Sequence, residues 1–149
     1  MLRLDDGDLR GLGRFENWGL VEKIGDGASW IDIEFDNMSD ELLRRRSHMS
    51  AAGGTTYVSN ECDNAGDMDV DSGAVGIIIE HLLRDGVRVG SLSNSGDLLI
   101  RGGGRLETDG ASILNTGSIA DSGAIVLDFG GSLTTNGATT VHEGGSLTS

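Results

Sequence analysis

Three aspartates that alternate along the chain, Asp67, Asp69 and Asp71, are residues of the type that binds cations. Calcium binds several carboxylate oxygens around one point, so the spacing suggests a metal site. The twelve-residue calcium loop needs glycine at its sixth place and glutamate at its twelfth, where this chain has Ser72 and Ile78. Alternating acids also mark the solvent side of a strand. We therefore predict a solvated strand here and assign no metal ligand.

The remaining reactive side chains are scattered. His48, His81 and His142 have no partner at metal-ligand spacing. Cys62 stands where other copies of its motif carry a larger apolar residue, which predicts a buried thiol and no nucleophile. The glycine run 102–104 is not followed by Lys-Ser or Lys-Thr, so it predicts no phosphate cradle. We predict no catalytic residue, no cofactor and no enzyme activity.

Three further patterns could bind a ligand, and each has a simpler interpretation. Trp18 and Trp30 could stack on sugar rings, although packing within the fold explains them as well. The run Arg44–Arg46 is the one basic cluster, and three charges are too few to anchor a membrane or nucleic acid. The pairs Thr134–Thr135 and Thr139–Thr140 resemble the threonine rows of ice-binding solenoids, but two pairs make no flat array.

Composition narrows the class of protein. The chain has 149 residues, 25 glycines, no proline, one cysteine and a formal net charge of −13. Such an acidic chain repels phosphate backbones, so we expect no nucleic-acid partner. No apolar run approaches the length that spans a bilayer, so we expect no membrane insertion. The acidic stretch Met1–Gly13 lacks the features of a secretory signal peptide.

A corner motif of asparagine followed by glycine recurs along the chain, each time before an apolar run. The glycines at 96, 117 and 137 are 21 and 20 residues apart. A fixed period of that size indicates stacked units and not one globular core. The five copies of the motif begin at the following residues: Phe15, Cys62, Leu92, Ile113 and Leu133.

Alternation within the units predicts strands. Ile31, Ile33 and Phe35 share one side of a segment whose other side is acidic, and the run 125–129 alternates in the same way. Six or seven coils spaced by about 4.8 Å would make a rod of roughly 30 Å. We predict an all-β fold, a single-stranded parallel β-helix (β-solenoid).

Stacking predicts two columns of equivalent residues. Asn17, Asn64, Asn94 and Asn115 should form a ladder in which each amide bonds the next, while Asn136 sits one place later in its motif and is left open. Leu98, Ile119 and Val141 should be neighbours in an apolar row.

Several segments depart from the pattern. Ser39–Ser47 has a helix-cap residue, early acids and late bases, which predicts a short helix or a loop that leaves the coil. Ile77–Leu83 is a buried strand or a helical insert. We assign 1–12 to a leader or disordered segment and 13–149 to the solenoid, interrupted at 38–59 and 77–90 and truncated at its C-terminal end, where Gly145–Ser149 stops within a motif.

The glycine-rich units over 13–37 and 60–149 resemble the repeats of large bacterial surface proteins, namely autotransporter passengers and filamentous-haemagglutinin adhesins. The clearest stretch is Gly13–Ile33, with its Phe-Glu-Asn-Trp-Gly corner and its Trp-Ile-Asp-Ile strand. The resemblance implies a right-handed parallel β-helix. It also implies an adhesin or stalk located outside the cell or on its surface.

We therefore expect a non-catalytic structural or adhesive segment whose loops at 38–59 and 77–90 contact a protein or carbohydrate ligand. One alternative is a carbohydrate-active β-helix of the polysaccharide lyase or hydrolase type, which needs clustered Asp, Lys or Arg on one side. Another is a phage fibre or capsid-decorating module whose coils trimerise. In every case bare solenoid ends expose strand edges, so we expect self-association through them.

Overall fold

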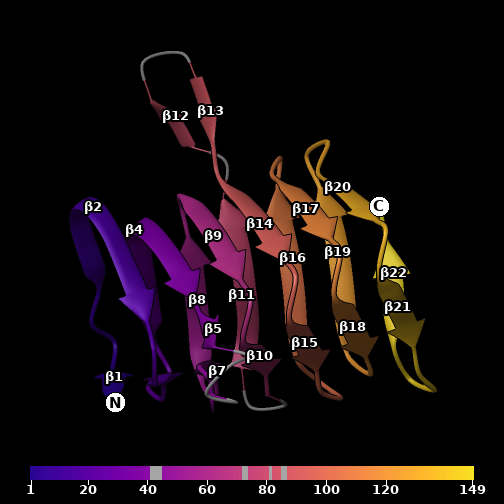
Figure 1. Cartoon of the computed structure of the whole chain (residues 1–149). Coiled ribbons are helices and arrows are strands. Elements are labelled where there is room, and N and C mark those ends of the chain that lie inside the picture. The colour runs from indigo at the N-terminus through magenta and orange to yellow at the C-terminus, as the bar shows by residue number, and fades with distance from the viewer. Residues whose placement is uncertain (41–44, 72–73, 81, 85–86) are drawn as a thin grey trace.

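The computed structural model describes residues 1–149 except 41–44, 72–73, 81 and 85–86 (Figure 1). Every regular element within this described part is a β-strand, and none is a helix. The strands form two large parallel sheets and two small antiparallel hairpins. The predicted all-β class with parallel pairing is confirmed, and the arrangement is consistent with a β-solenoid.

One sheet makes the first face of the molecule. All its strands are parallel, and each pairs with the equivalent strand of the next coil. The strands, in spatial order, are β1 (Leu2–Leu4), β3 (Leu20–Lys23), β7 (His48–Ala51), β10 (Asp67–Val70), β15 (Asp97–Ile100), β18 (Ser118–Asp121) and β21 (Ala138–Val141).

The other sheet bends into a second and a third face because β4 (Ala28–Asn37) belongs to both. Its first half pairs with β8 and its last three residues pair with β9, while β2 (Leu9–Asn17) runs beside both halves. The second face continues through β8 (Gly54–Val58), β11 (Ala74–Glu80), β16 (Arg105–Asp109), β19 (Ala124–Asp128) and β22 (Ser146–Thr148). The third face continues through β9 (Glu61–Asn64), β14 (Ser91–Asn94), β17 (Ser112–Asn115) and β20 (Ser132–Thr135).

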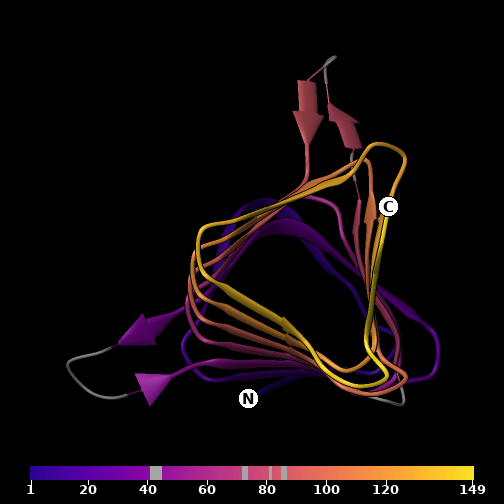
Figure 2. The same cartoon turned by 90° about the vertical axis from the view of Figure 1, so that its right-hand side faces the viewer.

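The chain visits the three faces in the same order in each coil, and the view along the stack shows a three-sided outline (Figure 2). Two hairpins project from different corners of this outline (Figure 2). The first arm is β5 (Ser39–Asp40) with β6 (Arg45–Arg46), and the second arm is β12 (Leu82–Arg84) with β13 (Val87–Val89).

The first arm corrects the helix predicted over 39–47. Its described ends are antiparallel strands in which Ser39 pairs with Arg46, so the alternative of a loop leaving the coil is the one observed. A helix this short is unstable unless packing supports it, whereas a hairpin closes on its own backbone hydrogen bonds. Residues 41–44 lie outside the described part.

Both predicted interruptions were too wide. Within 38–59, β7 and β8 pair in register with the neighbouring coils, and only the first arm leaves the stack. Within 77–90, the stretch 77–80 belongs to β11, where Ile77 and Ile79 are fully buried, so the buried strand is confirmed. The repeat was not recognisable in these segments because each arm adds residues between equivalent positions of successive coils, so the spacing of about twenty residues is lost.

The first coil also begins earlier than predicted. Residues 1–12, expected to be a leader or disordered, supply β1 and the start of β2. Leu2 and Leu4 pair with Val21 and Lys23, and Leu4 is 5 % exposed. The alternation of these leucines is the period-two pattern of a strand.

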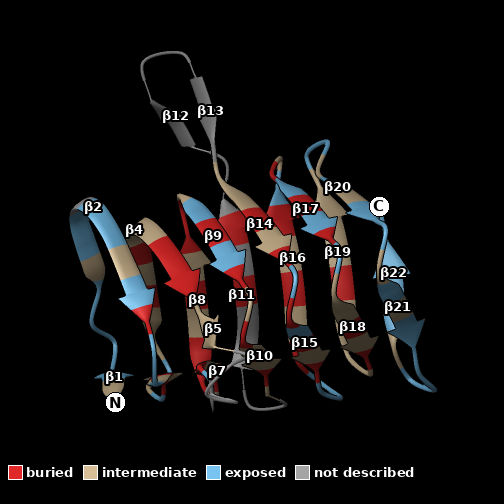
Figure 3. Ribbon diagram, in the orientation of Figure 1, coloured by how far each residue is buried: buried red, intermediate tan, exposed pale blue. Residues whose placement is uncertain are grey.

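Buried segments recur in successive strands (Figure 3). The core consists of columns in which a buried residue of each coil is the register partner of one in the next. Leu98 and Ile119 are neighbours as predicted, but Thr139 follows them and Val141 pairs with Asp121 instead. That part of the prediction was wrong because the corner glycine at 137 fixes where β21 begins. The complete column is Leu2, Val21, Met49, Met68, Leu98, Ile119 and Thr139.

The corner glycines stack so closely that no side chain fits between them. A Cβ at Gly96 would lie 2.1 Å from the carbonyl oxygen of Gly66, and one at Gly117 would lie 2.2 Å from that of Gly96. A Cβ at Gly137 would lie 2.1 Å from the carbonyl oxygen of Gly117. The recurring glycine is therefore required by coil-to-coil contact.

Candidate functional site

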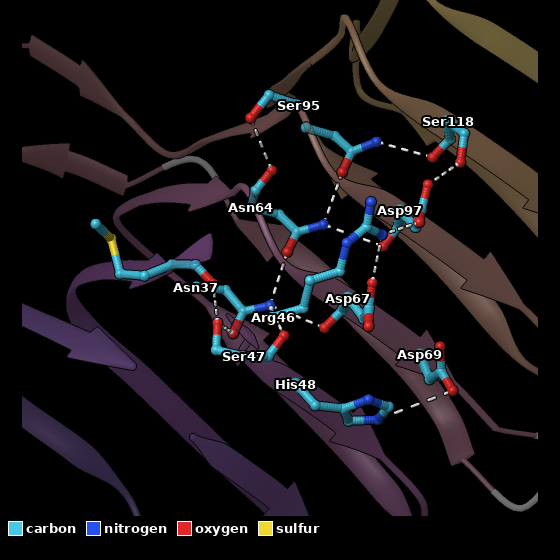
Figure 4. Close-up of polar contacts among 12 residues, drawn as sticks. Asn37, Arg46, Ser47, His48, Asn64, Asp67, Asp69, Ser95, Asp97 and Ser118 are labelled. Carbon is cyan, nitrogen blue, oxygen red and sulfur yellow. Dashed lines mark hydrogen bonds and ion pairs between the residues drawn. The ribbon is translucent and has the colours of Figure 1, made fainter. Parts of the chain in front are cut away.

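A ladder of five asparagines runs along the corner between the third and first faces. The Nδ2 of each of the first four donates to the Oδ1 of the next asparagine at 2.7 or 2.8 Å. All five side chains are buried, and Figure 4 shows the middle of the ladder. The members are Asn17, Asn37, Asn64, Asn94 and Asn115.

The ladder also joins two faces. Each Nδ2 donates a further hydrogen bond to a carbonyl oxygen of a first-face strand at 2.8 to 3.2 Å. These bonds satisfy buried donors and acceptors at a corner where the sheet ladder stops. A neutral amide neither gives nor takes a proton in this setting, so the column is a structural device. The accepting residues are His48, Asp67, Asp97, Ser118 and Ala138.

The predicted ladder is confirmed for its four named members, and the structure adds Asn37. The spacing of the motifs did not reveal Asn37 because the first arm separates it from a following glycine, although Phe35-Asp36-Asn37 repeats the form of the first motif. Asn136 lies outside the ladder. The hydroxyl of Thr135 takes the next place and accepts from Asn115 at 3.1 Å.

The acids that suggested calcium are bound by arginines on the outer side of the first face. Arg101 contacts Asp69 at 2.9 Å and Asp71 at 2.6 Å. Arg46, from the first arm, contacts Asp67 at 2.9 Å and also bonds Asp97 of the next coil (Figure 4). Over the residues described, no group of three or more His, Cys, Asp or Glu is placed to hold a metal ion.

The contacts of Arg46 tie the first arm to two coils. Hydrogen bonds to Asp67 and Asp97 raise the pKa of the guanidinium. A hydrogen bond from Ser118, 2.5 Å long, is the main cause of a lowered pKa at Asp97, and the bond from Arg46 adds to it. These side chains are exposed, so each pair contributes little to stability and mainly sets the direction of the arm.

The third face carries acids in a different setting. Asp36 is 4 % exposed, and its Oδ2 lies 2.8 Å from Arg14, while its Oδ1 has no hydrogen-bond partner. Burial raises the pKa of this carboxyl, the nearby guanidinium opposes that rise, and the charges of Asp63, Glu34 and Glu16 add to it. Negative charge therefore accumulates on this face without full compensation.

The two tryptophans differ in their surroundings: Trp30 is packed between neighbouring coils, whereas Trp18 is exposed. Trp30 is stacked on Tyr57, with ring centres 5.1 Å apart, and the guanidinium of Arg10 lies 5.4 Å from its ring centre. Arg10 belongs to the preceding coil and Tyr57 to the following one, so both ring faces are covered and the packing interpretation is confirmed. Trp18 is 57 % exposed and donates to Glu16 at 3.2 Å.

Two reactive groups are sealed in the core. Cys62 is 1 % exposed, and burial raises the pKa of its thiol to about 12, as expected for an apolar filler. Lys23, the single lysine, is also 1 % exposed, and it donates to Asp6 at 3.0 Å and to the carbonyl of Gly25. The hydrogen bond from Lys23 to the Asp6 carboxylate is the main cause of the lowered pKa of Asp6.

The histidines are not brought together where they are described. His48 Nε2 lies 3.9 Å from Asp69, and His142 is exposed near the C-terminal end. His81 lies outside the described residues, and so does Arg44 of the predicted basic cluster.

The described residues contain no helix long and apolar enough to span a bilayer. The sequence matches no protein-family model, no curated protein and no solved structure. The resemblance to bacterial surface repeats therefore stays a prediction, and the function is argued from the geometry.

Proposed function

We propose that this chain is a non-catalytic structural or adhesive segment of a bacterial cell-surface or secreted protein, built as a right-handed, single-stranded β-solenoid. Parallel strands joined by crossover connections are right-handed in nearly all proteins, which favours that hand. The glycine-rich corner motifs that resemble adhesin repeats favour the surface location.

The observation that carries this proposal is the continuity of the stack. Five buried amides, in-register strands and close-packed glycines bind each coil to the next along the described chain. Side chains that polysaccharide-cleaving enzymes would use have structural partners here, since Lys23 is buried against Asp6 and the first-face aspartates bind Arg46 and Arg101. Such a stack is suited to extension and display.

The two arms are the parts suited to contact a partner. They leave the stack at corners, where they interrupt no sheet ladder, and Arg46 fixes the base of the first arm. Specificity in a rigid scaffold usually lies in such projecting segments. A protein or carbohydrate on another surface is the proposed ligand class.

The test compares beads coated with the whole chain and with a variant in which Ser39–Arg46 is replaced by two glycines. The base of this arm is narrow, since Ser47 N donates to Met38 O at 3.1 Å, so the coil can close without it. We expect coated beads to adhere to cell or polysaccharide surfaces and the variant to lose most of that adhesion with an unchanged circular-dichroism spectrum. Equal adhesion of the two would contradict the role of the arm.

Two further readouts address the alternatives. Turnover of acidic polysaccharides by the intact chain would overturn the non-catalytic assignment. A stable trimer in solution would favour a fibre module in place of an adhesive segment.

A further inference from the structure

The last corner of the stack contains an asparagine that directly precedes glycine. In four ladder members a single residue separates the asparagine from the corner glycine, as in Asn115-Thr116-Gly117. In the last coil the asparagine stands one place later, so Asn136 is bonded to Gly137, and this is the one Asn-Gly dipeptide of the sequence. The pair is chemically distinctive because glycine carries no side chain to shield its backbone nitrogen from the asparagine.

The side chain of Asn136 is also unrestrained. It is exposed, and its amide makes no hydrogen bond with any residue that the structure describes, since the Thr135 hydroxyl occupies the ladder place of this coil. By contrast, Asn94 and Asn115 are buried, and each Nδ2 donates to a side chain of the next coil and to a backbone carbonyl. The ladder amides are therefore held away from their own main chain, whereas the Asn136 amide can turn toward it.

Gly137 cannot be exchanged for a residue that would shield this nitrogen. A Cβ here would lie 2.1 Å from the carbonyl oxygen of Gly117. Stacking therefore imposes a glycine, and with it an unshielded backbone nitrogen, next to an exposed amide. Each ladder asparagine is instead followed by a residue with a side chain, and these residues are Trp18, Met38, Ala65, Ser95 and Thr116.

The same nitrogen lies in a thinly packed coil. Gly137 N donates to Asn115 O at 3.1 Å, and Asn136 N donates to the same oxygen at 2.8 Å. No residue of β20, β21 or β22 is buried, whereas β17 and β18 of the preceding coil bury alternate residues. Segments with few buried contacts open locally at low free energy. Local opening of the last coil therefore releases Gly137 N without unfolding the ladder.

We propose that Asn136 is a site of spontaneous deamidation, with water as the co-reactant. The Gly137 nitrogen loses its proton and attacks Cγ of Asn136, so that the N–Cγ bond forms, the Cγ–Nδ2 bond breaks and ammonia leaves with the proton. Water then opens the cyclic imide. Cleavage of the N–Cγ bond gives aspartate, and cleavage of the bond between the nitrogen and the backbone carbonyl carbon of residue 136 gives isoaspartate. Asparagine is among the residues that proteins of hot environments avoid because of this lability.

Both products disturb the corner. Aspartate adds a negative charge, and isoaspartate routes the main chain through the side-chain carbons, which inserts a methylene before Gly137. The contacts at this place leave no room for that insertion, because Gly137 stacks closely on Gly117 and Ala138 N donates to Gly117 O at 2.9 Å. The reaction therefore loosens the last coil. Since it needs no enzyme, its extent records the age of the protein, whether or not the chain is adhesive.

The experiment ages the whole folded chain at mildly alkaline pH and then maps the asparagines by digestion and mass spectrometry. We expect Asn136 to convert at least about tenfold faster than Asn94 or Asn115, whose amides react only when the ladder opens. Hydrogen exchange at the amides of Gly137 and Ala138 should be faster in the aged chain than in the fresh one, because both amides bond the preceding coil.

Two variants separate the causes. Asn136→Ser leaves Gly137 in place but removes the reacting amide, so ageing should leave hydrogen exchange in its last coil unchanged. Freshly purified Asn136→Asp carries the new charge on an ordinary main chain, so loosening of the aged chain beyond that of this variant comes from isoaspartate.

Three results would overturn the proposal. Conversion of Asn136 in urea but not in the folded chain would mean that the stack shields it. Conversion of Asn94 and Asn115 in the folded chain as fast as that of Asn136 would mean that the ladder protects nothing. Equal hydrogen exchange in the aged chain and in aged Asn136→Ser would mean that the products leave the last coil intact.

Discussion

Asn94→Ala tests the ladder at an interior position. The Asn94 Nδ2 donates to Asn115 Oδ1 at 2.8 Å and to Ser118 O at 2.9 Å, and its Oδ1 accepts from Asn64 Nδ2 at 2.7 Å. The side chain is 1 % exposed, so water cannot replace it without opening the corner.

The expected cost follows from those three bonds. Each buried hydrogen bond contributes about 1 kcal/mol net, and each acceptor left unsatisfied in the interior adds to the loss. Asn115 Oδ1 and Ser118 O both lose their donor, whereas Asn64 Nδ2 keeps a bond to Asp97 O at 3.2 Å. We therefore expect the free energy of unfolding to fall by about 3 kcal/mol.

The chain supplies its own control. Asn136 belongs to the last corner motif but lies outside the ladder and is exposed, so Asn136→Ala should cost less than about 0.5 kcal/mol. Urea titration followed by circular dichroism gives the two differences, and hydrogen exchange at the amides of Thr116 and Gly117, both bound to Asn94 O, locates the loss. Similar stability of the two variants would refute the structural role of the ladder.

Three other predictions concern the core. Gly117→Ala should cost about 3 kcal/mol, because its Cβ would collide with the Gly96 carbonyl oxygen, while Gly7→Ala, with open space around it, should be nearly neutral in the same urea titration. The Cys62 thiol should resist alkylation in native buffer and react fully in guanidinium chloride, and fast native labelling would contradict its burial. Asp121 is fully buried, and burial raises its pKa, so the folded state binds the proton more tightly than the unfolded chain. Stability should then fall as pH rises from the unfolded pKa through the folded one, and Asp121→Asn should raise the melting temperature at neutral pH and flatten that slope; an unchanged slope would count against the assignment.

Local patterns determined a large part of the fold. Alternating apolar residues specify strands because successive side chains point to opposite sides, and the repeated glycine specifies a corner that admits no Cβ. The ladder members Asn17, Asn64, Asn94 and Asn115 were predictable because an equal place in each motif becomes an equal place in each coil.

Contacts between distant parts of the chain were decided only by the tertiary structure. Asn37 joined the ladder across an arm that sequence spacing could not measure, and Arg46 found Asp97 from 51 residues away. The same reason explains why the acids at 67–71 are paired, whereas Glu61 and Asp63 on the third face have no ion pair among the described residues. Pairing depends on which coil and which face each side chain reaches. The inserted arms decide this because they change the number of residues between equivalent positions in successive coils.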